Sequence, residues 1–223
     1  MKPLYSRLFT TLLKQTLPPQ TVVAVLVCLN ICCSTLSNAA EQPVVLVFGD
    51  SLSAAYGIEE NQGWVHLLKN KLAESAIEYH VVNGSVSGET STGGLARLPA
   101  MLDRYKPSIV VLELGGNDGL RGLPLKNLEQ NLEQMITLIA DSGAQTLLTG
   151  IQIPPNYGPR YTLPFAEIYS NLANQYQLPL VPFLIEGIPQ QPELMQADGI
   201  HPIAAAQSIV LENVWPYLKP LLD

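Results

Sequence analysis

Residues 44–53 read Val-Val-Leu-Val-Phe-Gly-Asp-Ser-Leu-Ser. Five apolar residues in a row, three of them valine, are typical of a strand that is buried on both faces of a sheet. Gly49 and Asp50 interrupt the run, so Ser51 follows at the carboxyl end of the predicted strand. Because ligands of open α/β sheets bind at the carboxyl ends of strands, Ser51 is a candidate to contact a substrate.

The rest of the chain alternates between short apolar runs and helical patterns. Further strands are predicted at 77–82, 109–114, 145–151 and 180–183. Helices are predicted at 64–75, 95–105, 124–142, 163–176 and 203–218. Pro124 suits a first helical turn, and Gly143 suits the position just after a helix end. This alternation predicts an α/β fold, a three-layer α/β/α sandwich around a parallel sheet of about five strands.

The first forty residues differ from the remainder of the chain. Their three charges are all positive, and a mostly apolar stretch runs from Thr21 to Cys33. This stretch is shorter than the roughly 20 residues that a membrane-spanning helix needs, and Ser37-x-Ala39 fits a leader cleavage site. We predict a secretory signal peptide over 1–40, a single domain over 41–223, and a periplasmic or extracellular location. An uncleaved anchor is the alternative.

The cysteine content and the net charge of the mature chain exclude several classes of function. Cys28, Cys32 and Cys33 are the only cysteines and lie in the predicted signal peptide, so the mature chain has no disulfide, thiolate nucleophile or cysteine zinc site. Its net charge is −10, with nine basic against nineteen acidic residues. This balance argues against nucleic-acid binding and against docking on anionic lipid. We expect a monomer without stable membrane insertion.

A catalytic serine needs a general base within reach and a third group that orients the base. The chain has three histidines. His66 and His80 lie within a predicted helix and a predicted strand, where structural roles are expected. His201 instead lies with Asp198 in the loop Asp-Gly-Ile-His-Pro. Asp198 could hold one ring nitrogen and leave the other facing Ser51, although an Asp-Gly turn with an incidental histidine has the same spacing.

Acyl transfer also needs hydrogen-bond donors where the negative charge of the oxyanion develops. The loop 83–90 contains Gly84 and Gly88, and a glycine there permits close approach of the backbone to a ligand. The loop 115–119 contains Asn117, whose side-chain amide can donate. Each loop alone could be a simple turn, but both are predicted at the same edge of the sheet as Ser51.

Four of these segments, in order, resemble the four sequence blocks of the GDSL/SGNH hydrolases. They are Gly49-Asp50-Ser51-Leu52, the Gly88 loop, Gly115-Gly116-Asn117-Asp118 and Asp198-Gly199-Ile200-His201-Pro202. The stretches at 94–99, 113–122 and 154–161 resemble one branch, the bacterial periplasmic acyl-CoA thioesterase, lysophospholipase and arylesterase type. The resemblance covers nearly the whole mature chain and implies a flavodoxin-like strand order.

The resemblance also implies a role for each site residue. Ser51 is the expected nucleophile, and His201 the general base and then the acid, with Asp198 orienting the imidazole. The expected oxyanion hole is formed by the backbone N–H groups of Ser51 and Gly88 and by the side-chain amide of Asn117. The expected reaction is hydrolysis of carboxylic esters and thioesters through an acyl-enzyme on Ser51, without a cofactor or a metal ion.

The acyl group of the substrate is expected beside the proline-rich stretch 153–161, which follows the fourth predicted strand. Its candidate substrate-binding residues are Ile153, Pro154 and Tyr157, and a stiff surface connection is the competing interpretation. Leu120 and Met195 are weaker candidates. The chain departs from the branch at Ala55, where glycine is usual, and at Glu89, where aspartate is common. Both departures bear on substrate preference.

Three other functions are considered. A carbohydrate O-acetylesterase of the same family is the main alternative. A non-catalytic binding module would not need serine, carboxylate and imidazole to coexist in these loops. An α/β-hydrolase proper is disfavoured, because Gly49-x-Ser51-x-Ser53 lacks the second glycine of that family's nucleophile turn.

Overall fold

The computed structural model describes residues 42–223, and the predicted signal peptide with its cysteines lies outside them. One parallel sheet contains β1 (Val44–Gly49), β2 (His80–Asn83), β3 (Ile109–Glu113), β4 (Gln145–Thr149) and β5 (Leu180–Val181). Its strand order is β2-β1-β3-β4-β5, the flavodoxin-like order. This confirms the predicted five-stranded α/β fold, in which β1 lies between β2 and β3.

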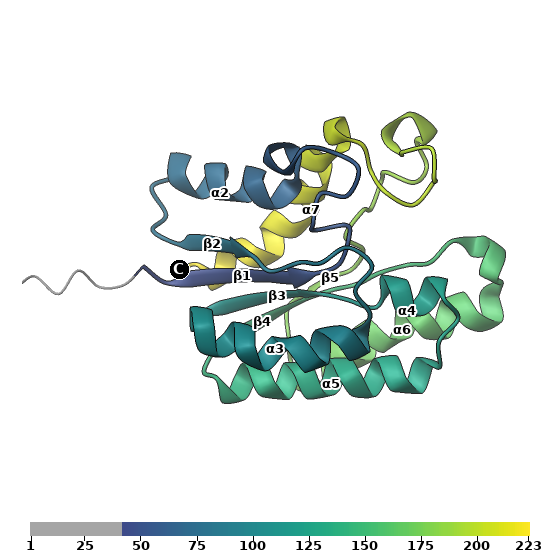
Figure 1. The fold of residues 1–223 in the computed structure, drawn as a ribbon, viewed down its shortest axis with the longest axis horizontal. Coiled ribbons are helices and arrows are strands. Elements are labelled where there is room, and N and C mark those ends of the chain that lie inside the picture. The colour runs from purple at the N-terminus through teal and green to yellow at the C-terminus, as the bar shows by residue number, and fades with distance from the viewer. Residues whose placement is uncertain (1–41) are drawn as a thin grey trace, which may run out of the picture. The chain divides into compact units, whose positions relative to one another are not determined.

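Helices cover both faces of the sheet (Figure 1). They are α2 (Trp64–Glu74), α3 (Ser91–Tyr105), α4 (Gly116–Leu120), α5 (Leu125–Asp141), α6 (Pro159–Tyr176) and α7 (Gln207–Leu218). α2 and α7 form one outer layer, and α3, α5 and α6 form the other. Short α4 follows β3 directly, so it lies at the carboxyl ends of the strands, where the predicted site residues gather.

The side chains of β1 alternate between two hydrophobic cores. Val45 and Val47 pack in the core under α2 and α7, whereas Leu46 and Phe48 pack in the core under α3, α5 and α6. All four side chains are fully buried. Because the side chains of a strand point alternately to opposite faces, a continuous apolar run serves both cores at once.

Several element boundaries were predicted wrongly. The second strand begins at His80 rather than residue 77, and pairs only with β1. α3 begins at Ser91 rather than residue 95, because the Thr90 hydroxyl accepts a hydrogen bond from the N–H of Gly93 and caps the helix. Gly94 suits this helix because a Cβ there would clash with Leu114.

The carboxyl-terminal half shows similar differences. α6 begins at Pro159, four residues earlier than predicted, directly after Gly158 with φ +81°. The last helix begins at Gln207 rather than residue 203, after a 3₁₀ turn over Ala204–Ala206. α4 was not predicted. None of the helices within residues 42–223 has both the length and the apolar character needed to cross a membrane.

Candidate active site

Ser51 lies in a tight turn directly after β1. The N–H of Ala54 donates to the carbonyl of Asp50 at 2.9 Å, and that of Tyr56 to the carbonyl of Ser51 at 3.2 Å. The hydroxyl of Ser51 lies 2.8 Å from Nε2 of His201, although the two residues are 150 positions apart in the sequence. The structure therefore brings the predicted nucleophile and the predicted base into direct contact.

The loop before α7 presents His201 through its own hydrogen bonds. The N–H of Gln196 donates to the carbonyl of His201 at 2.7 Å, and Met195 pairs with Pro202 in a single β-bridge. Oδ2 of Asp198 lies 2.7 Å from Nδ1 of His201. Oδ1 of Asp198 accepts from the backbone N–H groups of Ile200 at 2.9 Å and His201 at 3.1 Å. The carboxylate thus organises both the loop and the ring.

Electrostatics favour a charged Asp198. Partial burial opposes ionisation, but the hydrogen bonds from the His201 ring and from the two backbone N–H groups outweigh it. Together they lower the pKa of Asp198 to about 2. The carboxylate is therefore ionised at neutral pH and is suited to stabilise a protonated imidazole.

The two glycines of the 83–90 loop have different roles. The N–H of Gly84 donates to the carbonyl of Val47 at 2.8 Å and extends the pairing with β1. Within residues 42–223, by contrast, the N–H groups of Gly88 and Ser51 donate to no protein acceptor. Gly88 also has φ +79°, which favours glycine. Gly88 is therefore better placed than Gly84 to donate to a ligand.

The third predicted donor, Asn117, lies in the first turn of α4. Its Nδ2 donates to Oδ2 of Asp50 at 3.1 Å. The turn is held by Asp118, whose carboxylate accepts from the backbone N–H of Ser91 at 2.8 Å and from its hydroxyl at 2.6 Å. Arg121 at the end of α4 donates to the carbonyl of Gly88 at 2.9 Å and joins the two donor loops.

A cavity of about 690 Å³ adjoins Ser51 and Asn117. Most of its walls are apolar, and Leu120, Ile151, Ile153, Pro154, Leu163, Ala166, Ile185 and Met195 are among the residues that line it. Ile153, Pro154 and the weaker candidates Leu120 and Met195 are thus at the cavity. Tyr157 does not line it; its hydroxyl instead donates to the carbonyl of Leu120 at 2.8 Å.

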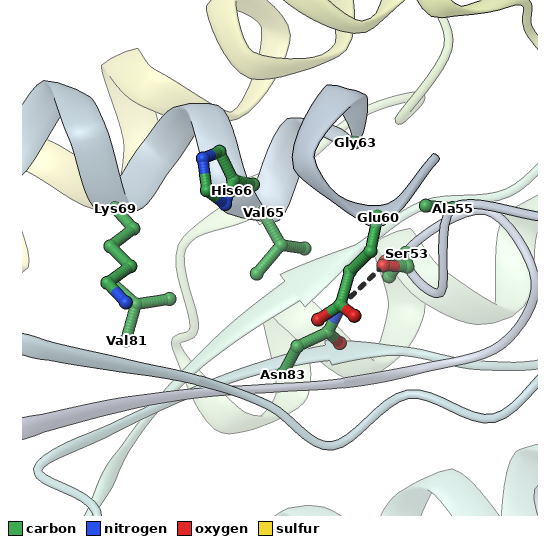
Figure 2. A pocket seen from close by; sticks show the side chains of 9 residues that line it. All are labelled: Ser53, Ala55, Glu60, Gly63, Val65, His66, Lys69, Val81 and Asn83. Atoms are coloured by element: carbon green, nitrogen blue, oxygen red, sulfur yellow. Dashed lines mark hydrogen bonds between the residues drawn. The ribbon is translucent and has the colours of Figure 1, made fainter. Parts of the chain in front are cut away.

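A second, smaller cavity of about 120 Å³ shares no residue with the first. Ser53, Glu60, His66, Lys69 and Asn83 are among its lining residues (Figure 2). His66 is half-buried on α2, and His80 is exposed on β2, so neither approaches Ser51 as His201 does. Within residues 42–223, no group of three or more His, Cys, Asp or Glu side chains is arranged to hold a metal ion.

Sequence reasoning did not find two features of the site. The ring of Tyr56 lies 4.5 Å from that of His201, centroid to centroid. No pattern in the sequence signals this contact, because Tyr56 is one exposed tyrosine in a turn. Glu113 and Asp50 form a buried pair of carboxyl groups beside Ser51. A single acidic residue inside the apolar run 109–114 is a signal that could have identified Glu113.

The structure shows how the chain accommodates Ala55 at a position where the family branch usually has glycine. Its φ is +58°, in the left-handed region that favours glycine. Its side chain is buried against Gly63, where an added Cβ would lie 2.9 Å from the Cβ of Ala55. The methyl group of Ala55 therefore fits only because residue 63 is a glycine and has no side chain.

Comparisons with known proteins agree with this geometry. The sequence profile of the GDSL-like lipase/acylhydrolase family matches residues 47–209. The chain is 55% identical over 187 residues to "Esterase TesA" of Pseudomonas aeruginosa, covering 84% of this chain and 93% of that protein. It is 43% identical over 186 residues to "Thioesterase 1/protease 1/lysophospholipase L1" of Escherichia coli K12, covering 83% and 88%.

A solved structure of similar fold is that of the psychrotrophic esterase EstA from Pseudoalteromonas sp., inhibited by monoethylphosphonate. It is 40% identical to this chain, has a TM-score of 0.77, and the match covers 80% of this chain and 98% of that one. The family profile spans most of the described residues, and all four sequence blocks lie at one edge of the sheet. The chain belongs to the GDSL-like lipase/acylhydrolase family of ester hydrolases.

Proposed function

We propose that this ester hydrolase works through an acyl-enzyme on Ser51, with His201 as general base and Asp198 as the residue that orients it. One observation carries the proposal: the continuous hydrogen-bonded chain from the Ser51 hydroxyl through both ring nitrogens of His201 to Asp198. This chain ends beside the larger cavity. A serine, an imidazole and a carboxylate in this order are the groups that acyl transfer requires.

The reaction has two steps. Oγ of Ser51 attacks the carbonyl carbon while Nε2 of His201 takes the hydroxyl proton, and Asp198 stabilises the resulting imidazolium. His201 then passes that proton to the leaving alcohol or thiol as the acyl-enzyme forms. In the second step His201 takes a proton from water, which attacks the acyl-enzyme, and Ser51 regains its proton as the carboxylic acid leaves.

The oxyanion of each step is assigned to three donors. They are the N–H of Ser51, the N–H of Gly88 and the side-chain amide of Asn117. The first two have no competing protein acceptor within the described residues, and Asn117 has one N–H left after its bond to Asp50. Preorganised donors of this kind stabilise the negative charge without reorganisation during the reaction.

The substrate class follows from the larger cavity. A mostly apolar space of about 690 Å³ suits the alkyl chain of a fatty acyl group better than an acetyl group. The names "Esterase TesA" and "Thioesterase 1/protease 1/lysophospholipase L1" describe action on oxygen esters, thioesters and lysophospholipids. We assign these three classes of acyl compound to this chain, with no cofactor, and rank them above acetylated carbohydrates.

The location of the enzyme follows from its first forty residues. We assign residues 1–40 to a signal peptide, residues 41–223 to a single secreted domain, and the mature chain to the periplasm or the extracellular space. The charge pattern and the small residues before residue 41 support this assignment. We expect the mature domain to be a monomer.

The test is a hydrolysis panel on the purified, exported protein and its Ser51→Ala variant. The panel contains p-nitrophenyl esters from acetyl to palmitoyl, acyl-CoA, lysophospholipid and acetylated sugars. We expect wild-type activity on medium and long acyl chains, and a loss of about 10³–10⁶ in rate for Ser51→Ala. Activity of Ser51→Ala equal to that of the wild type would refute the nucleophile. An optimum on acetyl esters without long-chain activity would refute the substrate class.

A further inference from the structure

Glu113 is a buried carboxyl group that the proposed acyl transfer does not use. It is the last residue of β3, it is 0% exposed, and it pairs with Gly49 of β1 in the sheet register. A Cβ on Gly49 would clash with Oε2 of Glu113, so the glycine of the first sequence block leaves room for this carboxyl group. Burying a carboxyl group is costly unless it is neutral or hydrogen-bonded, so its retention here needs a reason.

Glu113 holds both sides of the turn that carries the nucleophile. Its Oε2 accepts from the backbone N–H of Asp50 at 3.1 Å and from the hydroxyl of Ser53 at 2.8 Å. Asp50 and Ser53 lie on either side of Ser51 and Leu52. The carbonyl of Ser53 in turn accepts from Nδ2 of Asn83 at 2.9 Å, at the wall of the smaller cavity (Figure 2).

Asp50 connects Glu113 to the oxyanion donor Asn117. Its side chain is 2% exposed, and it accepts from Nδ2 of Asn117 and from the N–H of Leu52, both at 3.1 Å. This bond fixes the orientation of the Asn117 amide and leaves its second N–H without a protein acceptor among the described residues. The position of one oxyanion donor therefore depends on a carboxylate that the protein must keep charged and in place.

The two carboxyl groups cannot both be ionised at neutral pH. Burial raises the pKa of Asp50 to about 6, and burial followed by the charge of Asp50 raises the pKa of Glu113 well above its usual range. Within residues 42–223, no lysine or arginine forms an ion pair with either group. We therefore assign one retained proton to Glu113, whose buried Oε1 has no hydrogen-bond partner within residues 42–223.

We propose that Glu113, the buried carboxyl group at the end of β3, is a positioning residue of the oxyanion hole. It holds Asp50 and Ser53 in place, and Asp50 in turn presents the amide of Asn117. The inference rests on the proposed roles of Ser51 and Asn117. Other titratable groups near the pair are Tyr169 on α6 and His201 on the loop before α7, and Asp118 on α4 lies close to Tyr169.

Two substitutions separate the hydrogen bonds of Glu113 from its ability to ionise. Glu113→Gln keeps the size of the side chain, accepts from Asp50 and Ser53, and offers an N–H to the Asp50 carboxylate, but it cannot ionise. We expect its kcat at neutral pH to stay within about threefold of the wild-type value. Glu113→Leu removes all these bonds, and we expect kcat to fall about tenfold to 100-fold with KM nearly unchanged, because a donor is displaced.

The dependence of kcat on pH tests the role of Glu113 directly, because a purely structural role would leave this dependence unchanged. In the wild type, loss of the proton on Glu113 at alkaline pH puts two negative charges behind the oxyanion hole, so kcat falls there. We expect Glu113→Gln to lack this alkaline fall. At neutral pH the infrared spectrum of the wild type should contain the carbonyl band of a protonated carboxyl group, and Glu113→Gln should lack it. Glu60→Gln is the control, since Glu60 is an exposed carboxylate beside the smaller cavity (Figure 2).

Three results would overturn the proposal: a Glu113→Gln variant as inactive as Glu113→Leu, alkaline profiles that coincide, or full kcat in Glu113→Leu. Circular dichroism establishes folding, and if Glu113→Leu does not fold, the profile and the infrared band of Glu113→Gln decide. Labelling with a phosphonate ester separates this inference from the proposed function. If wild-type Ser51 is not labelled, the proposed function fails. If it is labelled and the Glu113 results are contrary, only this inference fails.

Discussion

Asp198→Asn tests how the imidazole of His201 is oriented. Oδ1 of Asp198 accepts from the two backbone N–H groups of Ile200 and His201, while Oδ2 faces Nδ1 of His201 at 2.7 Å. An asparagine in the same loop must place its carbonyl oxygen toward those backbone donors. Its NH₂ group then faces Nδ1 of His201, because the loop leaves no other satisfactory orientation.

This orientation selects the wrong tautomer of His201. Nδ1 must accept from the amide, so the ring proton moves to Nε2, which lies 2.8 Å from the Ser51 hydroxyl. A protonated Nε2 in a neutral ring cannot take the proton of Ser51, and the negative charge that stabilises the imidazolium is also gone. By analogy with other serine triads we expect kcat to fall about 10⁴-fold, or about 5 kcal/mol in activation free energy.

The assay is steady-state hydrolysis of a p-nitrophenyl ester, with circular dichroism to establish that the loop substitution leaves the fold intact. Asp103→Asn is the matched control, since Asp103 is an exposed aspartate on α3 away from the loop. We expect Asp103→Asn to keep wild-type kcat. A loss below about tenfold in Asp198→Asn would refute the reasoning, because the imidazole would then be oriented by another group.

Two further predictions concern the groups behind Ser51. Asn117→Ala should lower kcat about 10²–10³-fold, because an oxyanion donor is lost, and a change confined to KM would instead make Asn117 a substrate-binding residue. Asp50→Asn should gain stability relative to the wild type as pH rises from about 4 to about 6. Over that range the unfolded Asp50 has lost its proton while the buried one, with its pKa raised to about 6, still holds it, so wild-type stability falls with pH. Urea unfolding of both proteins at the two ends of this range measures the difference, and a difference independent of pH would contradict it.

Local signals were sufficient for the parts of the fold that depend on local physics. The run 44–48 predicted a strand buried on both faces, and Val45 and Leu46 indeed pack in different cores. Pro124 and Gly143 marked both ends of α5, with Gly143 at φ +84° just after the helix. The start of α3 was misplaced because a capping side chain and a contact with a distant residue both act on it. The cap from Thr90 and the contact of Gly94 with Leu114 extend α3 over residues that resemble a loop.

The candidate site shows the same division. Residue types, their order along the chain and the resemblance of four blocks selected Ser51, Asn117, Asp198 and His201. The positions of the predicted strand ends indicated that these residues would share one edge of the sheet. The resemblance also pointed to Gly88, and in the structure the N–H of Gly84 pairs with β1 while that of Gly88 has no protein acceptor within residues 42–223. Neither source indicated that Tyr157 would lie outside the cavity.

The amino-acid order alone thus carries the strand periodicity, the turn chemistry and the identity of the reactive groups, since each depends on residues close together along the chain. Distances and protonation states require the folded molecule. The 2.8 Å between Ser51 and His201 joins residues 150 positions apart, and it exists only because β1 and the loop before α7 meet in space. The proton proposed on Glu113 depends on the exclusion of water from Glu113 and Asp50, which the pairing of β1 with β3 and the burial of both side chains produce.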